Sequence, residues 1–180
     1  MVAMKKFLVV VDMQKDFVDG ALGTAEAEAI VPAVCKKIRD FCGEIFVTFD
    51  THTEDYLGSA EGKKLPVVHC VKNTDGWMLD KRVAAALKGK EYVPVEKPTF
   101  GSVRLPRLIK EQADGEDAEI ELIGLCTDIC VVSNALLLKA YFPEVPIAVD
   151  AACCAGVTPE AHNAALATMK SCQIDIENYN

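Results

Sequence analysis

Five short segments of the chain are mainly apolar without a regular alternation of apolar and polar residues. Uninterrupted runs of this kind are typical of strands that are buried on both faces of a sheet. They predict strands at residues 6–11, 45–49, 91–95, 120–123 and 146–149, with a last short strand near residues 173–176.

Apolar residues spaced three or four positions apart lie between these runs and predict helices with one buried face. The positions are Ile30, Val34, Ile38 and Phe41; Leu79, Val83 and Leu87; Leu105, Leu108 and Ile109; Val131, Ala135 and Leu138; and Ala161, Ala165, Met169 and Cys172. The sequence Thr158-Pro159-Glu160 is a typical helix start, with a hydroxyl cap and a proline in the first turn.

Alternating strands and helices predict an α/β fold with three layers, in which a parallel sheet of about six strands has helices on both faces. No repeat or linker interrupts the pattern, so residues 1–180 are expected to form a single domain. Residues 50–74 form the longest region without clear periodicity, and such regions are often functional.

Charge and composition exclude several classes of protein. Acidic residues outnumber basic ones by 27 to 19, and no stretch concentrates Lys and Arg, so no nucleic-acid partner is expected. The apolar run near the start is short and is followed at once by Asp12 and Lys15, so it predicts neither a membrane segment nor a signal peptide. We therefore expect a cytoplasmic protein, and we interpret most of its eight cysteines as buried free thiols.

Candidate chemistry lies just after the predicted strands, because ligands of open parallel sheets bind beyond the carboxyl ends of the strands. Asp12, Lys97 and Cys130 supply a carboxylate, an ammonium and a thiol there, a trio that can perform acyl transfer. Each residue also has a simpler interpretation. Asp12 would cap the turn at residues 13–17, Lys97 would form a surface ion pair, and Cys130 would be one more buried thiol.

Cys130 lies where the fourth predicted strand gives way to a helix, with Thr127 or Asp128 as the expected cap. A thiol in the first turn of a helix feels the positive end of the helix dipole, and a nearby lysine lowers the pKa further. This position predicts a nucleophilic thiolate near neutral pH. Unpaired backbone N–H groups of the same turn could hold an oxyanion.

A second group consists of Asp50, His52 and His69, with Glu61 as a possible fourth member. An Asp-x-His pair after a strand sends both side chains the same way, and a later His can complete a set of metal ligands. The alternative is a loop of hydrogen-bonded polar residues. The third histidine, His162, lies inside the last predicted helix and is expected at the surface, so Cys130 has no histidine base.

Five segments together resemble a known family in their order and spacing. They are VVDMQKDF at residues 10–17, TFDTH at 48–52, LPVVHC at 65–70, KPTF at 97–100 and GLCTDICV at 124–131. Over nearly its whole length the chain resembles the isochorismatase-like cysteine hydrolases, and within them the nicotinamidases. The resemblance implies an amidohydrolase that converts nicotinamide and water to nicotinate and ammonia through a thioester on Cys130.

The resemblance also implies roles for single residues. Asp12 is the proton shuttle, Lys97 its electrostatic partner and Cys130 the nucleophile. A cis peptide bond precedes Cys126, and the backbone N–H groups of Cys126 and Cys130 form the oxyanion hole.

A divalent metal ion is a further implication of the nicotinamidase branch, whose ligands match Asp50, His52 and His69. In some members a loop glutamate joins them, which corresponds to Glu61. The ion would hold the pyridine nitrogen of nicotinamide. Mixed carboxylate and imidazole ligands suit Zn²⁺, our first choice, as well as Mn²⁺ and Fe²⁺. Family members often form homo-oligomers, so we expect one here.

One feature departs from the family pattern. Many nicotinamidases have a tryptophan shortly before the second metal histidine, whereas this chain has Leu65-Pro66-Val67-Val68. Phe17, Phe100 and Leu65 are therefore the expected pocket residues.

A metal-independent isochorismatase-type hydrolase, or one that acts on another small amide or a carbamoyl group, is the alternative enzyme. A thiol-rich α/β binding module is the alternative from another class.

Overall fold

The computed structural model describes residues 4–179, and its centre is a six-stranded sheet in the order β3-β2-β1-β4-β5-β6. Every pair of neighbouring strands is parallel, as the sequence predicted. The strands are β1 (Lys5–Val11), β2 (Glu44–Asp50), β3 (Val93–Lys97), β4 (Ala118–Leu125), β5 (Ile147–Ala155) and β6 (Asp175–Glu177).

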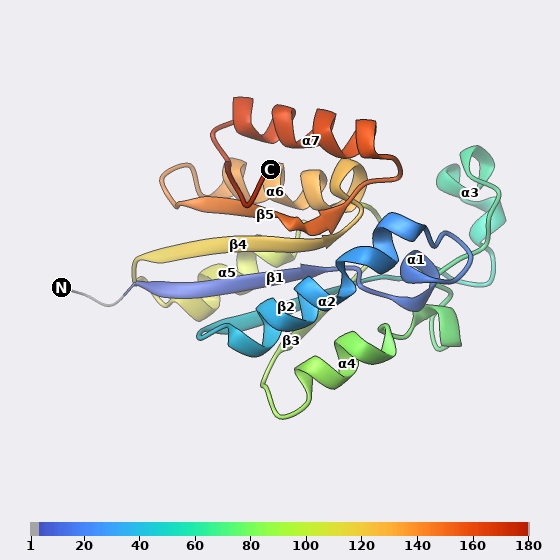
Figure 1. Cartoon of the computed structure of the whole chain (residues 1–180), viewed down its shortest axis with the longest axis horizontal. Coiled ribbons are helices and arrows are strands. Elements are labelled where there is room, and N and C mark those ends of the chain that lie inside the picture. Colours follow the sequence, from blue (N-terminus) through green and yellow to red (C-terminus); the bar gives the residue numbers. More distant parts are fainter. Residues whose placement is uncertain (1–3, 180) are drawn as a thin grey trace.

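Helices cover both faces of this sheet and give the three predicted layers (Figure 1). They are α1 (Lys15–Val18), α2 (Ala25–Asp40), α3 (Ala60–Lys64), α4 (Lys81–Leu87), α5 (Leu105–Ala113), α6 (Val132–Tyr141) and α7 (Pro159–Ser171). Side chains of α2 and α4 pack on one face, and those of α5, α6 and α7 pack on the other. No helix among residues 4–179 is long and apolar enough to cross a membrane.

Burial on both faces explains why β1 is apolar without alternation. Phe7, Val9 and Val11 point into the core beneath α5, α6 and α7, whereas Leu8 and Val10 point into the core beneath α2 and α4. All five side chains are buried. The continuous run is therefore the pattern that a central strand between two helical layers requires.

The largest difference from the predicted elements is the length of β5. The sequence predicted residues 146–149, but the strand continues to Ala155, so Asp150 lies within it rather than after it. A buried acid in a strand is tolerated because the Lys37 ammonium of α2 lies 2.8 Å from the Asp150 carboxylate. The prediction ended the strand at a charge whose partner lies far away in the sequence.

Helix starts give one confirmed prediction and one that is wrong. Thr158 caps α7, and its hydroxyl accepts a hydrogen bond from the Ala161 N–H at 3.2 Å. The segment around Cys130, however, starts as a π-helix, η3 (Thr127–Val131), whose cap residue is Cys126 with no side-chain hydrogen bond. Neither Thr127 nor Asp128 is the cap, because both side chains bond to the segment around the start of α7.

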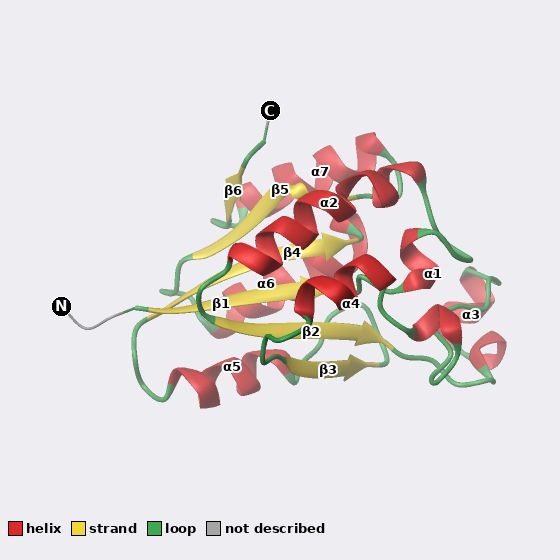
Figure 2. Cartoon of the chain, turned by 60° about the horizontal axis from the view of Figure 1, so that its bottom comes forward, coloured by secondary structure: helices red, strands yellow, loops and turns green. Residues whose placement is uncertain are grey.

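The strands are parallel throughout, and α1 and α3 lie beyond the arrowheads of β1, β2 and β3 (Figure 2). Asp50 and Lys97 are register partners at the ends of β2 and β3, and Asp12 follows the last residue of β1. Near this end β4 comes very close to β1 at Gly124, which has φ of +119°. A Cβ at Gly124 would lie 2.1 Å from the Val11 carbonyl oxygen, so the approach requires glycine.

The eight cysteines are all free thiols, as predicted, and five of them are buried. Cys42 and Cys172 are exposed, and Cys126 is intermediate.

Candidate active site

Asp12, Lys97 and Cys130, which we call the thiol cluster, come together at the carboxyl end of the sheet. The Lys97 Nζ lies 2.6 Å from Asp12 Oδ2 and 3.5 Å from Cys130 Sγ. All three side chains are buried, with Lys97 only 1% exposed. Lys97 is therefore not a surface ion pair.

Asp12 does not cap the turn that follows it. The Thr48 hydroxyl donates a 2.6 Å hydrogen bond to Asp12 Oδ1, while Oδ2 faces Lys97. Although Lys97 is close, Oδ2 has no partner in hydrogen-bonding geometry among residues 4–179. This oxygen is suited to accept a proton from a neighbouring group.

The electrostatics of the thiol cluster correct one prediction. Burial raises the pKa of the Cys130 thiol well above its usual range, the Asp12 carboxylate adds to this, and Lys97 opposes it. Burial also raises the pKa of the Asp12 carboxyl, again opposed by Lys97. The prediction of a preformed thiolate considered the helix end and the lysine but not the burial of Cys130. The direction of this shift favours the thiol form of Cys130, so a nearby group has to take its proton as the sulfur attacks.

The turn that carries Cys130 has the backbone that the resemblance implied. The Leu125–Cys126 peptide bond is cis, and the Cys126 carbonyl accepts hydrogen bonds from the N–H groups of Ile129 and Val131. The far end of the turn is held by Asn134, whose Nδ2 donates to the Cys130 carbonyl at 2.8 Å.

Asn134 also links this turn to the loop after β3, because its Oδ1 accepts the Ser102 N–H at 2.9 Å. Sequence reasoning did not identify Asn134. The available signal was a polar residue on the buried face of a predicted helix, between Val131 and Leu138.

Asp50, His52, Glu61 and His69, which we call the histidine cluster, converge on one point. One ligand atom from each lies within 4.8 Å of those of the others. Asp50 Oδ2 lies 2.9 Å from His52 Nε2 and 3.5 Å from His69 Nε2, and Glu61 Oε1 lies 3.7 Å from each imidazole. Two imidazoles and two carboxylates at this spacing fit a divalent metal ion.

One carboxylate of this cluster and the orientation of one imidazole suit a cation. Burial opposes ionisation of Asp50, but its interactions with His52, His69 and Lys97 outweigh it and hold its pKa well below the usual range. The Val67 carbonyl lies 2.7 Å from His69 Nδ1, which places a proton on Nδ1 and leaves Nε2 for the cluster.

Two residues of the segment after β1 hold the backbone of the histidine cluster. The fully buried Gln14 donates to the Asp50 carbonyl at 2.9 Å and accepts the Asp50 N–H at 2.8 Å. Asp16 accepts the N–H of Cys70, the neighbour of His69, at 2.8 Å. Neither role was predicted, since the partners are backbone groups far away in the sequence.

A cavity of about 210 Å³ connects the two clusters. Its polar lining includes Cys130, Asp50, Glu61 and His69, and its other walls are mostly apolar. Phe17, Phe100 and Leu65, the expected pocket residues, all line it, together with Leu22, Thr24, Cys126, Ile129 and Val157. The volume and the apolar walls fit a small, largely apolar ligand such as a single ring.

The one tryptophan of the chain is not a wall of this cavity. Trp77 packs against Phe49 with ring centroids 5.3 Å apart, and its indole N–H donates to the Thr51 hydroxyl at 2.9 Å. Leu65, in the segment before His69, supplies an aliphatic wall instead.

The prediction that His162 is a surface residue away from the chemistry is wrong. His162 is half-buried, and its Nδ1 lies 2.8 Å from the Thr127 hydroxyl, in the turn that carries Cys130.

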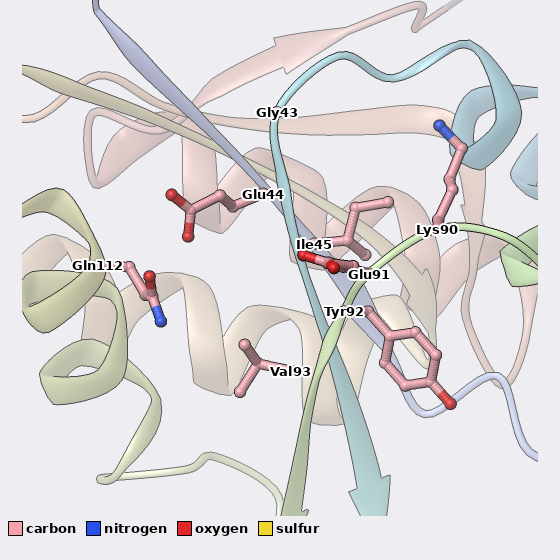
Figure 3. Close-up of a pocket in the computed structure, with 8 residues that line it drawn as sticks. All are labelled: Gly43, Glu44, Ile45, Lys90, Glu91, Tyr92, Val93 and Gln112. Atoms are coloured by element: carbon pink, nitrogen blue, oxygen red, sulfur yellow. The ribbon is translucent and has the colours of Figure 1, made fainter.

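A larger open hollow, of about 860 Å³, lies at the opposite end of the sheet. Figure 3 shows its residues around the starts of β2 and β3: Gly43, Glu44, Ile45, Lys90, Glu91, Tyr92, Val93 and Gln112. None of them is a thiol or an imidazole. The chemistry of the lining, rather than size, therefore places the candidate active site at the carboxyl end.

Comparisons with known proteins agree with this geometry. The model of the isochorismatase domain family matches residues 6–177. A Bacillus subtilis protein described as an uncharacterized isochorismatase family protein, PncA, is 28% identical over 173 residues, which cover 91% of this chain and 93% of that protein.

Solved structures are similar over nearly the whole chain. A nicotinamidase/pyrazinamidase PncA from Bacillus subtilis has a TM-score of 0.83 at 26% identity and covers 97% of this chain and 100% of its own. A pyrazinamidase of Pyrococcus horikoshii in complex with zinc has a TM-score of 0.81 at 26% identity, with 97% and 99% covered.

Proposed function

This chain belongs to the isochorismatase family, and within that family we propose that it is a metal-containing cysteine amidohydrolase that converts nicotinamide and water to nicotinate and ammonia. The observation that carries the proposal is the shared cavity of about 210 Å³. Cys130 lines this cavity together with three members of the histidine cluster, Asp50, Glu61 and His69. A ring and its carboxamide can therefore meet both clusters at once.

The first half of the reaction uses the thiol cluster. Cys130 Sγ attacks the carboxamide carbon while its proton passes to Asp12 Oδ2. The backbone N–H groups of Cys126 and Cys130 hold the oxyanion. Asp12 returns the proton to the departing nitrogen, so ammonia leaves and a thioester on Cys130 remains.

In the second half of the reaction, water cleaves the thioester and Cys130 becomes the leaving group. Asp12 accepts a proton from water as the water attacks the thioester carbon, and the proton returns to the departing Cys130 sulfur. Nicotinate is released. Burial lowers the pKa of Lys97, but its interactions with Asp12, Cys130 and Asp50 outweigh burial and raise it, which favours the charged ammonium.

Asp50, His52, Glu61 and His69 would hold a divalent ion, for which we propose Zn²⁺. The zinc complex of the Pyrococcus horikoshii pyrazinamidase supports this choice over Mn²⁺ or Fe²⁺. When bound, the ion supplies a Lewis acid that can accept the lone pair of a ring nitrogen. A pyrazine carboxamide offers the same lone pair and is the second candidate substrate.

An ammonia-release assay tests the proposal. We expect metal-loaded protein to hydrolyse nicotinamide and pyrazinamide and to hydrolyse benzamide, which lacks the ring nitrogen, much more slowly. Metal analysis of the purified protein separates the proposal from a metal-independent hydrolase. Absence of ammonia release from every amide would favour a binding module. A homo-oligomeric state and a cytoplasmic location remain predictions.

A further inference from the structure

The third histidine contacts the turn that carries the nucleophile. His162 lies in the first half of α7, and its Nδ1 is 2.8 Å from the hydroxyl of Thr127. Thr127 is fully buried and directly follows Cys126, whose backbone N–H is a proposed oxyanion donor. A displacement of Thr127 therefore moves one side of the oxyanion hole.

A second contact joins the same two segments. Asp128 Oδ1 accepts a hydrogen bond from the Val157 N–H at 3.0 Å, and Val157 also lines the cavity. Next to Val157, a Cβ at Gly156 would lie 2.7 Å from the backbone nitrogen of His162 and 2.9 Å from Asp128 Oδ1. The connection from β5 to α7 thus fits closely against the start of η3.

The turn that carries the nucleophile, residues 126–130, is held at its two ends by different elements. Asn134 of α6 bonds to the Cys130 carbonyl, whereas His162 of α7 bonds to Thr127 beside Cys126. Oxyanion donors must lie about 2.7–3.1 Å from the developing charge, so both ends of the turn need to be fixed.

From these contacts we propose that His162 is a positioning residue for the oxyanion hole and acts through the hydroxyl of Thr127. The inference rests on the proposed function, because it assigns an oxyanion to the Cys126 and Cys130 N–H groups. Burial lowers the pKa of His162, and the charge of Asp128 opposes this shift. In a neutral imidazole, Nδ1 can accept a hydrogen bond from the Thr127 hydroxyl while Nε2 carries the ring proton.

The test compares two substitutions of the histidine. His162→Ala removes the hydrogen bond, and we expect kcat for nicotinamide to fall by roughly 10- to 100-fold, as small misplacements of catalytic groups do. KM should stay within about threefold, because the walls of the cavity are unchanged. His162→Asn should recover most of the lost rate, since its side-chain amide can reach the position of Nδ1.

Thr127 provides an independent arm. Thr127→Val should lower kcat to a similar extent, and Thr127→Ser, which keeps the hydroxyl, should lower it much less. The double variant His162→Ala/Thr127→Val should be no slower than the slower single variant, because both changes remove one interaction. Asn163→Ala, at an exposed neighbouring position on α7, is the matched control and should leave kcat unchanged.

Alkylation of Cys130 by iodoacetamide distinguishes positioning from general damage. This reaction forms no oxyanion, so its rate in His162→Ala should stay within about threefold of the wild type. A His162→Ala variant with wild-type kcat overturns the inference, and so does an equal loss of kcat and alkylation. If the wild type releases no ammonia from any amide, the proposed function fails first and the inference fails with it.

Discussion

The two clusters at the ends of the cavity differ in how they are built and in what they hold. The thiol cluster joins the ends of β1 and β3 to η3, and one lysine lies between a carboxylate and a thiol whose pKa values are both raised. The histidine cluster takes Asp50 from the end of β2, Glu61 from α3, and His52 and His69 from the loops on either side of α3, and the pKa of Asp50 is held low.

This difference teaches that the site separates two tasks. In the thiol cluster a carboxylate and a thiol lie next to one lysine, which suits proton transfer. In the histidine cluster two carboxylates and two imidazoles converge on one point, which suits a cation. The Lys97 Nζ, 3.4 Å from Asp50 Oδ1, is a direct contact between them. Substitutions that leave Lys97 and Asp50 in place should keep the function of the other cluster largely intact.

Removal of the nucleophile should give the largest effect. We expect Cys130→Ala to lower kcat by more than about 1,000-fold, because no other group forms the thioester. The metal content and Tm should remain close to those of the wild type, since alanine suits this helical position. An ammonia-release assay with metal analysis measures both, and an active Cys130→Ala would contradict the mechanism.

Loss of the proton acceptor should come next. Asp12→Asn keeps the shape of the side chain but cannot take the thiol proton, so the rate should fall by about 100-fold or more. Retention of more than about a tenth of the rate would show that Asp12 is not the shuttle.

The pH profile is the control for this assignment. Asp12 must be ionised to accept a proton, so kcat/KM should fall as the pH decreases through its pKa. Burial raises that pKa, and the acid limb should therefore lie above the ordinary aspartate value of about 3.9. The residual activity of Asp12→Asn should lack this limb, and an unchanged limb would assign it to another group.

A substitution in the histidine cluster should affect binding rather than proton transfer. We expect His52→Ala to lose the metal ion and to raise KM for nicotinamide more than about 10-fold, with a much smaller change for benzamide. Alkylation of Cys130 by iodoacetamide should stay within about tenfold of the wild type. Equal losses for both amides would show that the ion is structural or takes part in the chemistry directly.

The smallest effect is expected from Gln14, which is not a member of the histidine cluster but bonds to the backbone of Asp50. Gln14→Met removes the hydrogen bonds to the Asp50 backbone, and metal affinity should fall by about 10-fold, as for other residues behind metal ligands. Competition with a chelator measures this, and Gln112→Met, at an exposed position, is the matched control. Unchanged affinity would show that Gln14 supports only the fold.

Much of this organisation was predictable from local patterns. Continuous apolar runs identified the five longer strands, because both faces of the sheet are covered there, and the residues after those runs identified the first members of both clusters. The second half of β5 was missed because Asp150 looks like a strand end until its partner Lys37 is known.

The supporting contacts could not be predicted in this way. Gln14, Asn134 and His162 each bond to a group distant in the sequence, and nothing in their neighbours indicates that partner. The direction of the Cys130 pKa was missed for a related reason, because burial is a property of the assembled site.

The close approach of β4 to β1 at Gly124 has a consequence for the mutational tolerance of the chain. Gly124 holds no reacting group, yet any side chain there would meet the Val11 carbonyl just before Asp12. In a saturation mutagenesis screen for activity, this position should tolerate substitution as poorly as the nucleophile itself. Variants at Cys130 should lose activity but still fold. Variants at Gly124 should lose activity because the strands that carry the site no longer fit together.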